Sequence, residues 1–267
     1  LAAAATVVGL PALSAAAAPA AAPATTLTAT ARNIGTLGTT SSATAIDGTV
    51  VVGDSNKNAS VVHAFAYDLN TSTMRDLGTL GGTISHAVAV DGDIVVGQAL
   101  TAGRAQHAFA YDLRTSTMRD LGTLGGSFST ATDVDGSLVV GNSSTAEGGQ
   151  HAFAYDLAVG TMHDLGTLGG RDSSALAVSA GVATGTSVTA TGDSHAYAAD
   201  LRLPTTSLRD LGTLGGRSSV AFGVDANTVA GRSATASGSD HAFAYDLTTG
   251  AMRDLGTLGG RYSVPPA

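Results

Sequence analysis

The stretch "HAFAYDLRTSTMRDLGTLGG" (residues 107–126) decides the fold, because it recurs along the chain almost unchanged. Copies of its first half begin at His63, His107, His151, His195 and His241, and the closing heptapeptide DLGTLGG occurs five times. Self-similarity at a period of about 44 residues indicates a repeat architecture, in which each unit buries its core against its neighbours. The chain of 267 residues therefore consists mainly of about five such units.

Each unit contains four strand-like segments. In the second copy, residues 85–90 alternate in the period-2 pattern of a strand, and Asp-Gly at 91–92 predicts a tight hairpin turn. A short β-branched run at 94–96 predicts a buried second strand that Gly97 ends, followed by a nine-residue loop. Residues 107–113 and 117–122 supply the third and fourth strands.

The third segment, 107–113, has two unequal faces. His, Phe, Tyr and Leu point to one side of the predicted strand, and Ala, Ala and Asp point to the other. A bulky face and a small face on one strand suit a sheet packed between two neighbouring sheets. We therefore expect the large face of one unit to fill against the small face of the next.

Four short strands in about 44 residues, repeated, predict an all-β fold, a β-propeller of about five four-stranded blades. DLGTLGG then marks the crossing from one blade to the next, where Gly81 and Gly82 supply unusual dihedrals. A phosphate-binding loop is disfavoured, because neither a helix signal nor a lysine follows these glycines. The expected blades are 41–78, 85–122, 129–166, 173–212 and 218–256.

Sequence outside the five units suggests how the ring ends. Residues 32–38, "RNIGTLG", copy a fourth strand and are expected to pair with the fifth blade and close the ring. Residues 1–30 are alanine-rich and uncharged, which predicts the remnant of a secretory signal followed by an Ala/Pro/Thr linker. The propeller is then expected over 31–267.

Two known patterns match the unit. The order of its "DG" turn, "VVG", "YD" and final polar strand resembles the kelch blade in phase. "HAFAYDL…DLGTLGG…VDG…VVG" resembles the HAF-repeat family of probable extracellular repeat proteins, over about residues 32–263. The resemblance implies export and a repeat architecture, and it brings no catalytic residues to this chain.

Composition disfavours several partners. The net charge is −8 and Lys57 is the only lysine, so nucleic acid is not expected as a partner. No cysteine is present, which excludes disulfides and thiolate chemistry. Past residue 30 no long charge-free apolar run occurs, and we expect no membrane insertion of the mature domain.

The repeated ionisable residues favour structural roles. One histidine and two aspartates recur in each unit, and a residue needed in every unit is better explained by hydrogen bonding than by catalysis. His86 and His163 stand outside this pattern and are expected at the surface. No catalytic motif, cofactor motif or metal motif is recognised, so we predict no catalytic residues, no cofactor and no metal.

Specificity is expected where the units differ. The loops between strands 2 and 3 and the residues after each "GG" share one end of a propeller. Arginine and aromatic side chains there suit an acidic glycan, which makes these residues candidates for a binding site. The alternative is that they are solvated loop residues with no ligand. The candidates are Arg171, Arg217, Arg104, Arg232 and Phe128, with Arg261 and Tyr262 beside them.

These observations predict a secreted, non-enzymatic binding or scaffold protein, which contacts a glycan or a surface protein outside the cell. The alternative is an extracellular propeller enzyme, a polysaccharide lyase or a hydrolase, with a site assembled from several blades. A third possibility is a purely structural spacer.

Overall fold

The computed structural model describes residues 31–203, 206–258 and 260. The chain divides into two compact units, and the second, Ile34–Ala267, holds every described strand. The predicted signal remnant and linker, Arg261 and Tyr262 lie outside the described residues. Within the described ranges no helix occurs, and hence none long and apolar enough to cross a membrane.

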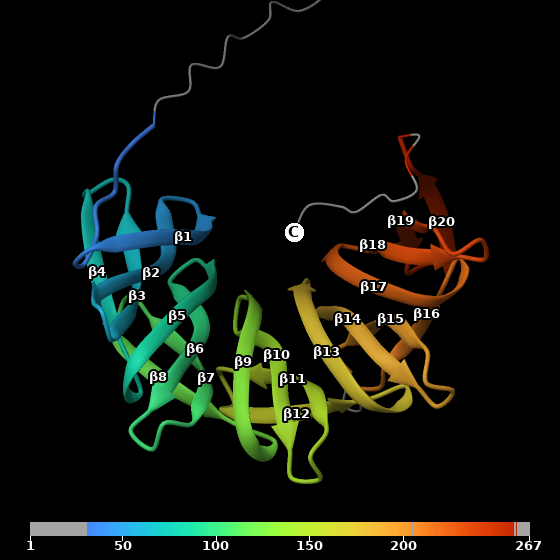
Figure 1. Ribbon diagram of the computed structural model, residues 1–267, viewed down its shortest axis with the longest axis horizontal. Helices are drawn as coiled ribbons and strands as arrows, with labels where there is room; N and C mark the ends of the chain where they lie inside the picture. The colour runs from blue at the N-terminus through green and yellow to red at the C-terminus, as the bar shows by residue number, and fades with distance from the viewer. Residues whose placement is uncertain (1–30, 204–205, 259, 261–267) are drawn as a thin grey trace, which may run out of the picture. The chain divides into compact units, whose positions relative to one another are not determined.

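Twenty strands form five successive groups of four, which we call repeats 1 to 5 (Figure 1). The strands are β1 Thr40–Asp47, β2 Val50–Asn58, β3 Val61–Asp68, β4 Thr73–Gly78; β5 Gly81–Asp91, β6 Ile94–Thr101, β7 Gln106–Asp112, β8 Thr117–Gly122; β9 Gly125–Asp135, β10 Leu138–Thr145, β11 Gln150–Asp156, β12 Thr161–Gly166; β13 Gly169–Ser179, β14 Val182–Thr189, β15 Ser194–Asp200, β16 Arg209–Gly212; β17 Gly215–Asp225, β18 Thr228–Thr235, β19 Asp240–Asp246 and β20 Ala251–Gly256.

Each repeat is an antiparallel meander, in which its four strands pair in chain order. Consecutive repeats join through one parallel bridge, such as Val62 with Ile84. Repeats 3 and 4 lack this bridge, so the strands form one sheet of twelve strands and one of eight. Among the described strands, neither sheet closes on itself.

The predicted ring closure does not occur within the described part of the chain. No strand pairing joins β20 to residues 32–38. That segment contacts repeat 1 instead, where the Leu37 amide donates to Ser55 Oγ at 2.9 Å and Ser41 Oγ donates to the Gly35 carbonyl at 2.7 Å. It therefore occupies, in front of repeat 1, the place that each GTLGG segment takes before its own repeat.

The predicted packing of large on small faces is confirmed. Ala64 and Ala66 of β3 share a buried cluster with Phe109 and Tyr111 of β7, in the next repeat. Ala108 of β7 likewise packs with the aromatic side chains of β11, and the pattern continues to repeat 5. Because both faces of an inner repeat are buried in this way, the core lies between repeats rather than inside any one of them.

At each junction a buried serine forms hydrogen bonds between the two repeats. Ser219 Oγ in β17 accepts from the Ala196 amide of β15 at 2.8 Å and donates to the Gly212 carbonyl of β16 at 2.6 Å. Ser85, Ser129 and Ser173 make the same two bonds to the repeat before them. The hydroxyl thus satisfies one donor and one acceptor that the packing removes from water.

Two expectations for the second strand were wrong. Gly97 does not end it, because β6 runs on to Thr101. Gly97 is required by the bulge at Val88 in the facing strand, since a Cβ at 97 would lie 2.0 Å from the His86 carbonyl oxygen. The extended strands also shorten the expected nine-residue loops, and only residues 102–105 connect β6 to β7.

The glycines of DLGTLGG have different structural roles from those predicted. Gly78 and Gly81 adopt positive φ values of 76° and 99°, which glycine tolerates best. Gly82 does not, and it is needed for close approach, because a Cβ there would lie 2.6 Å from the Leu100 Cβ. The first strand of the next repeat begins already at Gly81, ahead of the expected start at residue 85.

We predict that Ser219→Ala lowers the free energy of unfolding by about 2–4 kcal/mol, because it leaves a buried amide and a buried carbonyl without their partner. Chemical denaturation followed by circular dichroism measures the change. Ser41→Ala is the matched control at the same position of repeat 1, where the serine is exposed. Its cost should stay below about 1 kcal/mol, and an equal cost for both variants would contradict the role of the buried serine.

Candidate functional site

A hollow of the same construction recurs at each of the four junctions. Its wall combines an aliphatic side chain that begins the second strand, an alanine and an aspartate of the third strand, a basic side chain of the fourth strand, and a leucine from the next repeat. The volumes are about 320, 160, 260 and 350 Å³ from the first junction to the last. At least one carboxylate and at least one basic side chain therefore line each hollow.

The carboxylates are held by the turns that they cap. Asp112 Oδ1 accepts from the amides of Arg114 and Thr115 at 2.8 and 3.2 Å. These two backbone hydrogen bonds hold the pKa of Asp112 below its usual range, so the group is ionised at neutral pH. Asp68, Asp156, Asp200 and Asp246 cap the corresponding turns, which confirms the structural role predicted for this position.

The basic side chains reach across the junction. Arg119 Nη1 donates to the Leu157 carbonyl at 2.9 Å, and Arg209 Nη1 donates to the Leu247 carbonyl at 3.0 Å. Arg75 makes the equivalent bond to Leu113. One edge of each of these guanidinium groups is fixed by a carbonyl, while Arg119 and Arg209 still line their hollows.

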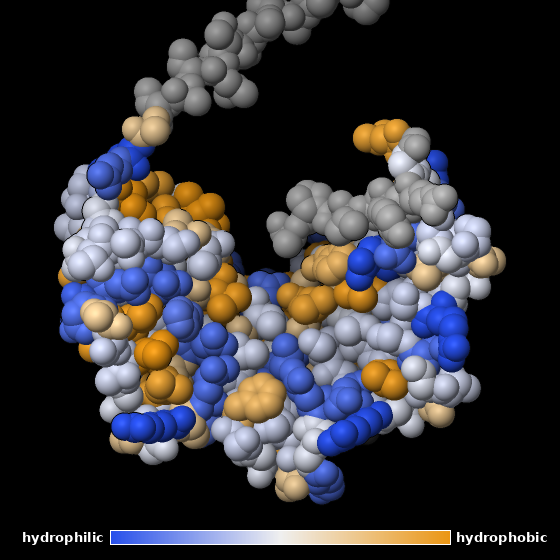
Figure 2. Space-filling model, in the orientation of Figure 1, coloured by the Kyte–Doolittle hydropathy of each residue, from blue (hydrophilic) through white to orange (hydrophobic). Residues whose placement is uncertain are grey.

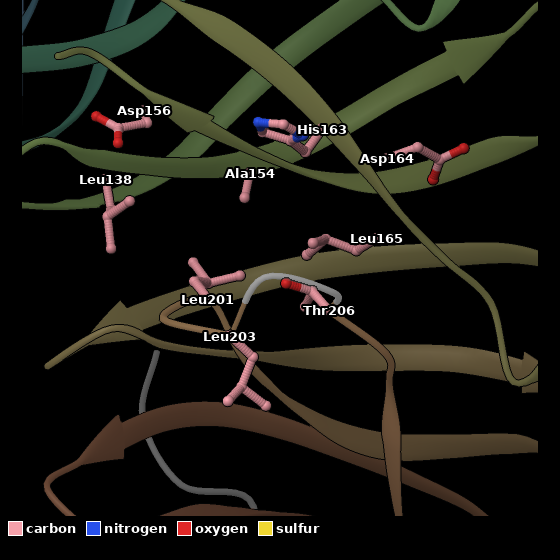
Figure 3. A pocket seen from close by; sticks show the side chains of 9 residues that line it. All are labelled: Leu138, Ala154, Asp156, His163, Asp164, Leu165, Leu201, Leu203 and Thr206. Carbon is pink, nitrogen blue, oxygen red and sulfur yellow. The ribbon is translucent and has the colours of Figure 1, made fainter. Parts of the chain in front are cut away.

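The third junction departs from this pattern in three ways. His163 stands where the other repeats have arginine, and it makes a 3.0 Å hydrogen bond to Thr161. Ala199 replaces the tyrosine of the other third strands, so the ring that packs at the other junctions is missing. The longer hairpin of repeat 4 adds Leu203 and Thr206 to the wall. Figure 3 shows Leu201, Leu203 and Thr206 of repeat 4 on one side of this hollow, across from Asp156, His163 and Asp164 of repeat 3.

Side chains replace backbone pairing at the same junction. Asp172 Oδ1 accepts from the Gln150 amide at 2.9 Å, where other junctions have the parallel bridge. Asp133, an alanine or glycine position in the other repeats, accepts from the Val178 amide at 2.8 Å. Burial raises the pKa of Asp133, although its two backbone hydrogen bonds oppose the shift. The third hollow thus lies at a junction where side-chain hydrogen bonds take the place of the parallel bridge.

The arginines predicted from the sequence lie at the opposite end of the repeats and line none of the four hollows. Arg171 Nη2 donates to the Gly148 carbonyl at 2.6 Å, and Arg217 Nε donates to Asp193 Oδ1 at 2.6 Å. Both therefore tie the first strand of a repeat to a loop of the repeat before it. The other candidates are Arg232, paired with Asp240, the exposed Arg104 at a φ of 66°, and the partly buried Phe128.

The repeated histidines are structural, as predicted. Each donates from Nδ1 to a carboxylate oxygen of the DLG aspartate of its own repeat, at 2.7 to 2.9 Å. In repeat 5 the Gly256 amide and His241 together hold the pKa of Asp254 below its usual range. No group of three or more acidic or histidine side chains is placed to hold a metal ion in the part of the chain that the structure describes.

Sequence reasoning missed the hollows. Their aspartates were assigned only to structural hydrogen bonding, and His163 was expected only at the surface. His163 is indeed exposed, but it also lines the third hollow. The sequence did contain a signal for the third hollow. His163 in repeat 3, Ala199 in repeat 4 and the longer hairpin of repeat 4 all lie at the third junction.

Comparison with known proteins supports the fold. No protein-family model matches this sequence, and no curated protein matches it. Among solved structures, TolB from Acinetobacter baumannii is 15% identical with a TM-score of 0.51, covering 77% of this chain and 52% of its own. A putative TolB from Agrobacterium tumefaciens is 12% identical with a TM-score of 0.51, covering 81% and 80%. A prolyl endopeptidase is 14% identical with a TM-score of 0.56, covering 80% and 34%.

At these identities the likeness concerns the fold alone. The protein is all-β and β-propeller-like. This chain spans about half the length of the Acinetobacter TolB and about a third of the prolyl endopeptidase.

We predict that Tyr197→Phe raises the free energy of unfolding by about 1–3 kcal/mol. The Tyr197 hydroxyl is buried and has no hydrogen-bond partner among the described residues, and burial raises the pKa of this phenol. Thermal or chemical unfolding measures the gain. Tyr245→Phe is the opposite control, because its hydroxyl accepts from Arg209 at 3.1 Å and its loss should destabilise. Destabilisation by Tyr197→Phe would show that this hydroxyl is satisfied.

We also predict that His163→Arg adds about 0.5–1 kcal/mol of stability, because arginine restores the bond across the junction, to the Leu201 carbonyl. Denaturation midpoints of the two proteins measure the effect. The reverse change, Arg119→His, should lower stability by a similar amount. No change in either variant would mean that this bond contributes nothing.

Proposed function

We propose that the chain is a secreted, non-enzymatic binding module, a propeller of five kelch-like blades that engages a repeating polysaccharide outside the cell. Five four-stranded meanders, packed large face on small face, support the blade assignment. Export is supported by the alanine-rich, uncharged sequence of residues 1–30.

The observation that carries the binding role is the fourfold recurrence of one hollow. Each copy offers a carboxyl group, a basic side chain and aliphatic walls at the same place in the repeat. Sugar hydroxyls hydrogen-bond to such charged groups, and the C–H face of a sugar ring packs on aliphatic carbon. A ligand with a repeating structure can occupy several copies together, and weak contacts then add to a useful affinity.

One observation favours an extracellular enzyme as the second candidate. His163 and two aspartates line the third hollow, and histidine with carboxylates is a common acid–base set. Against this, Asp164 already accepts from His151 and from the Gly166 amide, and Asp156 caps a turn. Asp133, whose pKa is raised, lines none of the four hollows and accepts two backbone amides. This arrangement supports binding more than turnover.

The test is binding of the purified chain to neutral and acidic polysaccharides, with oligosaccharides of increasing length and product analysis of every hit. We expect affinity to rise with length, without turnover. The double variant Asp112→Asn, Asp156→Asn keeps the oxygens that cap the turns and removes two charges, and it should lower affinity for the polymer at least about tenfold.

The variant Arg171→Ala, Arg217→Ala is the matched control at the opposite end. If this variant loses binding while the aspartate variant binds fully, the binding site lies at the end of the repeats that holds Arg171 and Arg217. Released products in any sample would establish the enzyme instead.

A further inference from the structure

Repeat 5 exposes the face that every other repeat buries. Leu77, Leu121, Leu165 and Leu211 of the DLG motif are 4–5% exposed, whereas Leu255 at the same position is 54% exposed. Ala242 and Ala244 are partly exposed, although their counterparts in repeats 1 to 4 are all buried. The local sequences HAFAYDL and MRDLG are the same as in repeat 2, so the exposed surface is one that this chain covers elsewhere.

Repeat 1 exposes the complementary face. Ala43 is exposed, whereas Ala87, Ala131, Ala175 and Ala221 at the same position are at most 1% exposed. Ser41 is likewise exposed, and Ile46 is 62% exposed where Val134 and Val178 are 5% exposed. Figure 2 shows hydrophobic side chains at the surface of repeat 1 and also beside β20. No strand pairing joins repeat 1 to repeat 5 among the described residues.

The four internal junctions show what covers such a pair of faces. Leu77 is buried by Ala87 and Val95 of the following repeat, whose counterparts in repeat 1 are Ala43 and Val51. The polar contacts have counterparts too. Asp47 Oδ2 accepts from the Gly92 amide of the next repeat at 2.8 Å, and this contact recurs from Asp91 to Gly136 and from Asp135 to Ala180. Ser179 takes the aspartate position at the fourth junction, and Asp225 of repeat 5 with Gly48 of repeat 1 would form this pair at a fifth.

We propose that repeat 5 of one copy docks on repeat 1 of a second copy, so that the chain associates head to tail through a fifth junction of the same kind as the internal four. Leu255 and the β19 alanines would pack on Ala43, Val51 and Ile46 of the second copy. Ser41 Oγ would accept from the Ala242 amide, as Ser85 accepts from Ala64. The two faces are different surfaces, so the contact is heterologous and each copy keeps one further face open.

Head-to-tail contact makes a prediction that symmetric dimerisation does not. Leu255→Arg blocks only the repeat 5 face, and Ile46→Arg blocks only the repeat 1 face; both side chains are exposed, so neither change should disturb folding. Each variant alone should stay a monomer of 26.1 kDa, because both contacts it could make would include a blocked face. An equimolar mixture still contains one intact face of each kind, so it should form a dimer and nothing larger.

Sedimentation velocity over a thousandfold range of concentration tests this for the whole chain. The wild-type protein should grow beyond a dimer as concentration rises, and each blocked variant should lose this growth. Val159→Arg, at an exposed apolar side chain of a hairpin, is the control that should associate like wild type. A wild-type protein that stays monomeric throughout would overturn the proposal, as would a mixture of the two variants that fails to dimerise while wild type associates.

Discussion

The contact between an aromatic face and an alanine face across each junction is the interaction on which the rest of the structure depends. A single meander of four short strands cannot bury both of its faces. The phenylalanine and tyrosine of one third strand fill the space that the alanines of the preceding one leave, and the leucine of DLG closes the cluster. Stability in this protein therefore belongs to pairs of repeats and not to single repeats.

The polar groups follow from that packing. Once two sheets are pressed together, the amide and carbonyl groups at their inner edge lose water and need partners. The buried serine hydroxyl bonds to both, and in repeats 1 to 3 the aspartate of the first turn accepts an amide from the next repeat. The histidine–aspartate pairs fasten the third strand to the fourth within a repeat. Many of the ionisable residues take part in this framework, and the hollows at the junctions recur at the same place in four of the repeats.

Much of the fold could be predicted from the sequence, because the repeat period and the alternation in HAFAYDL carry it directly. The strand lengths could not, since Gly97 resembles a terminator until the bulge opposite it is known. The site was harder to predict than the fold. Arg171 and Arg217 were chosen because they vary between repeats, but the partners that occupy them lie in a neighbouring repeat, and sequence order hides that contact. The hollows were hidden for the same reason.

The near-identity of the repeats has a consequence for folding. Because the surfaces that meet at one junction closely resemble those at the others, a repeat that docks on the wrong neighbour gains many of the same contacts, and repeat proteins are prone to such misassembly. Repeat 4 is the exception, since Tyr197, Ala199 and Ser179 alter both its packing and its turn. Its neighbour across the third junction has matching changes at His163 and Asp133. These differences distinguish the third junction from the others, so repeats 3 and 4 fit each other better than they fit a wrong neighbour.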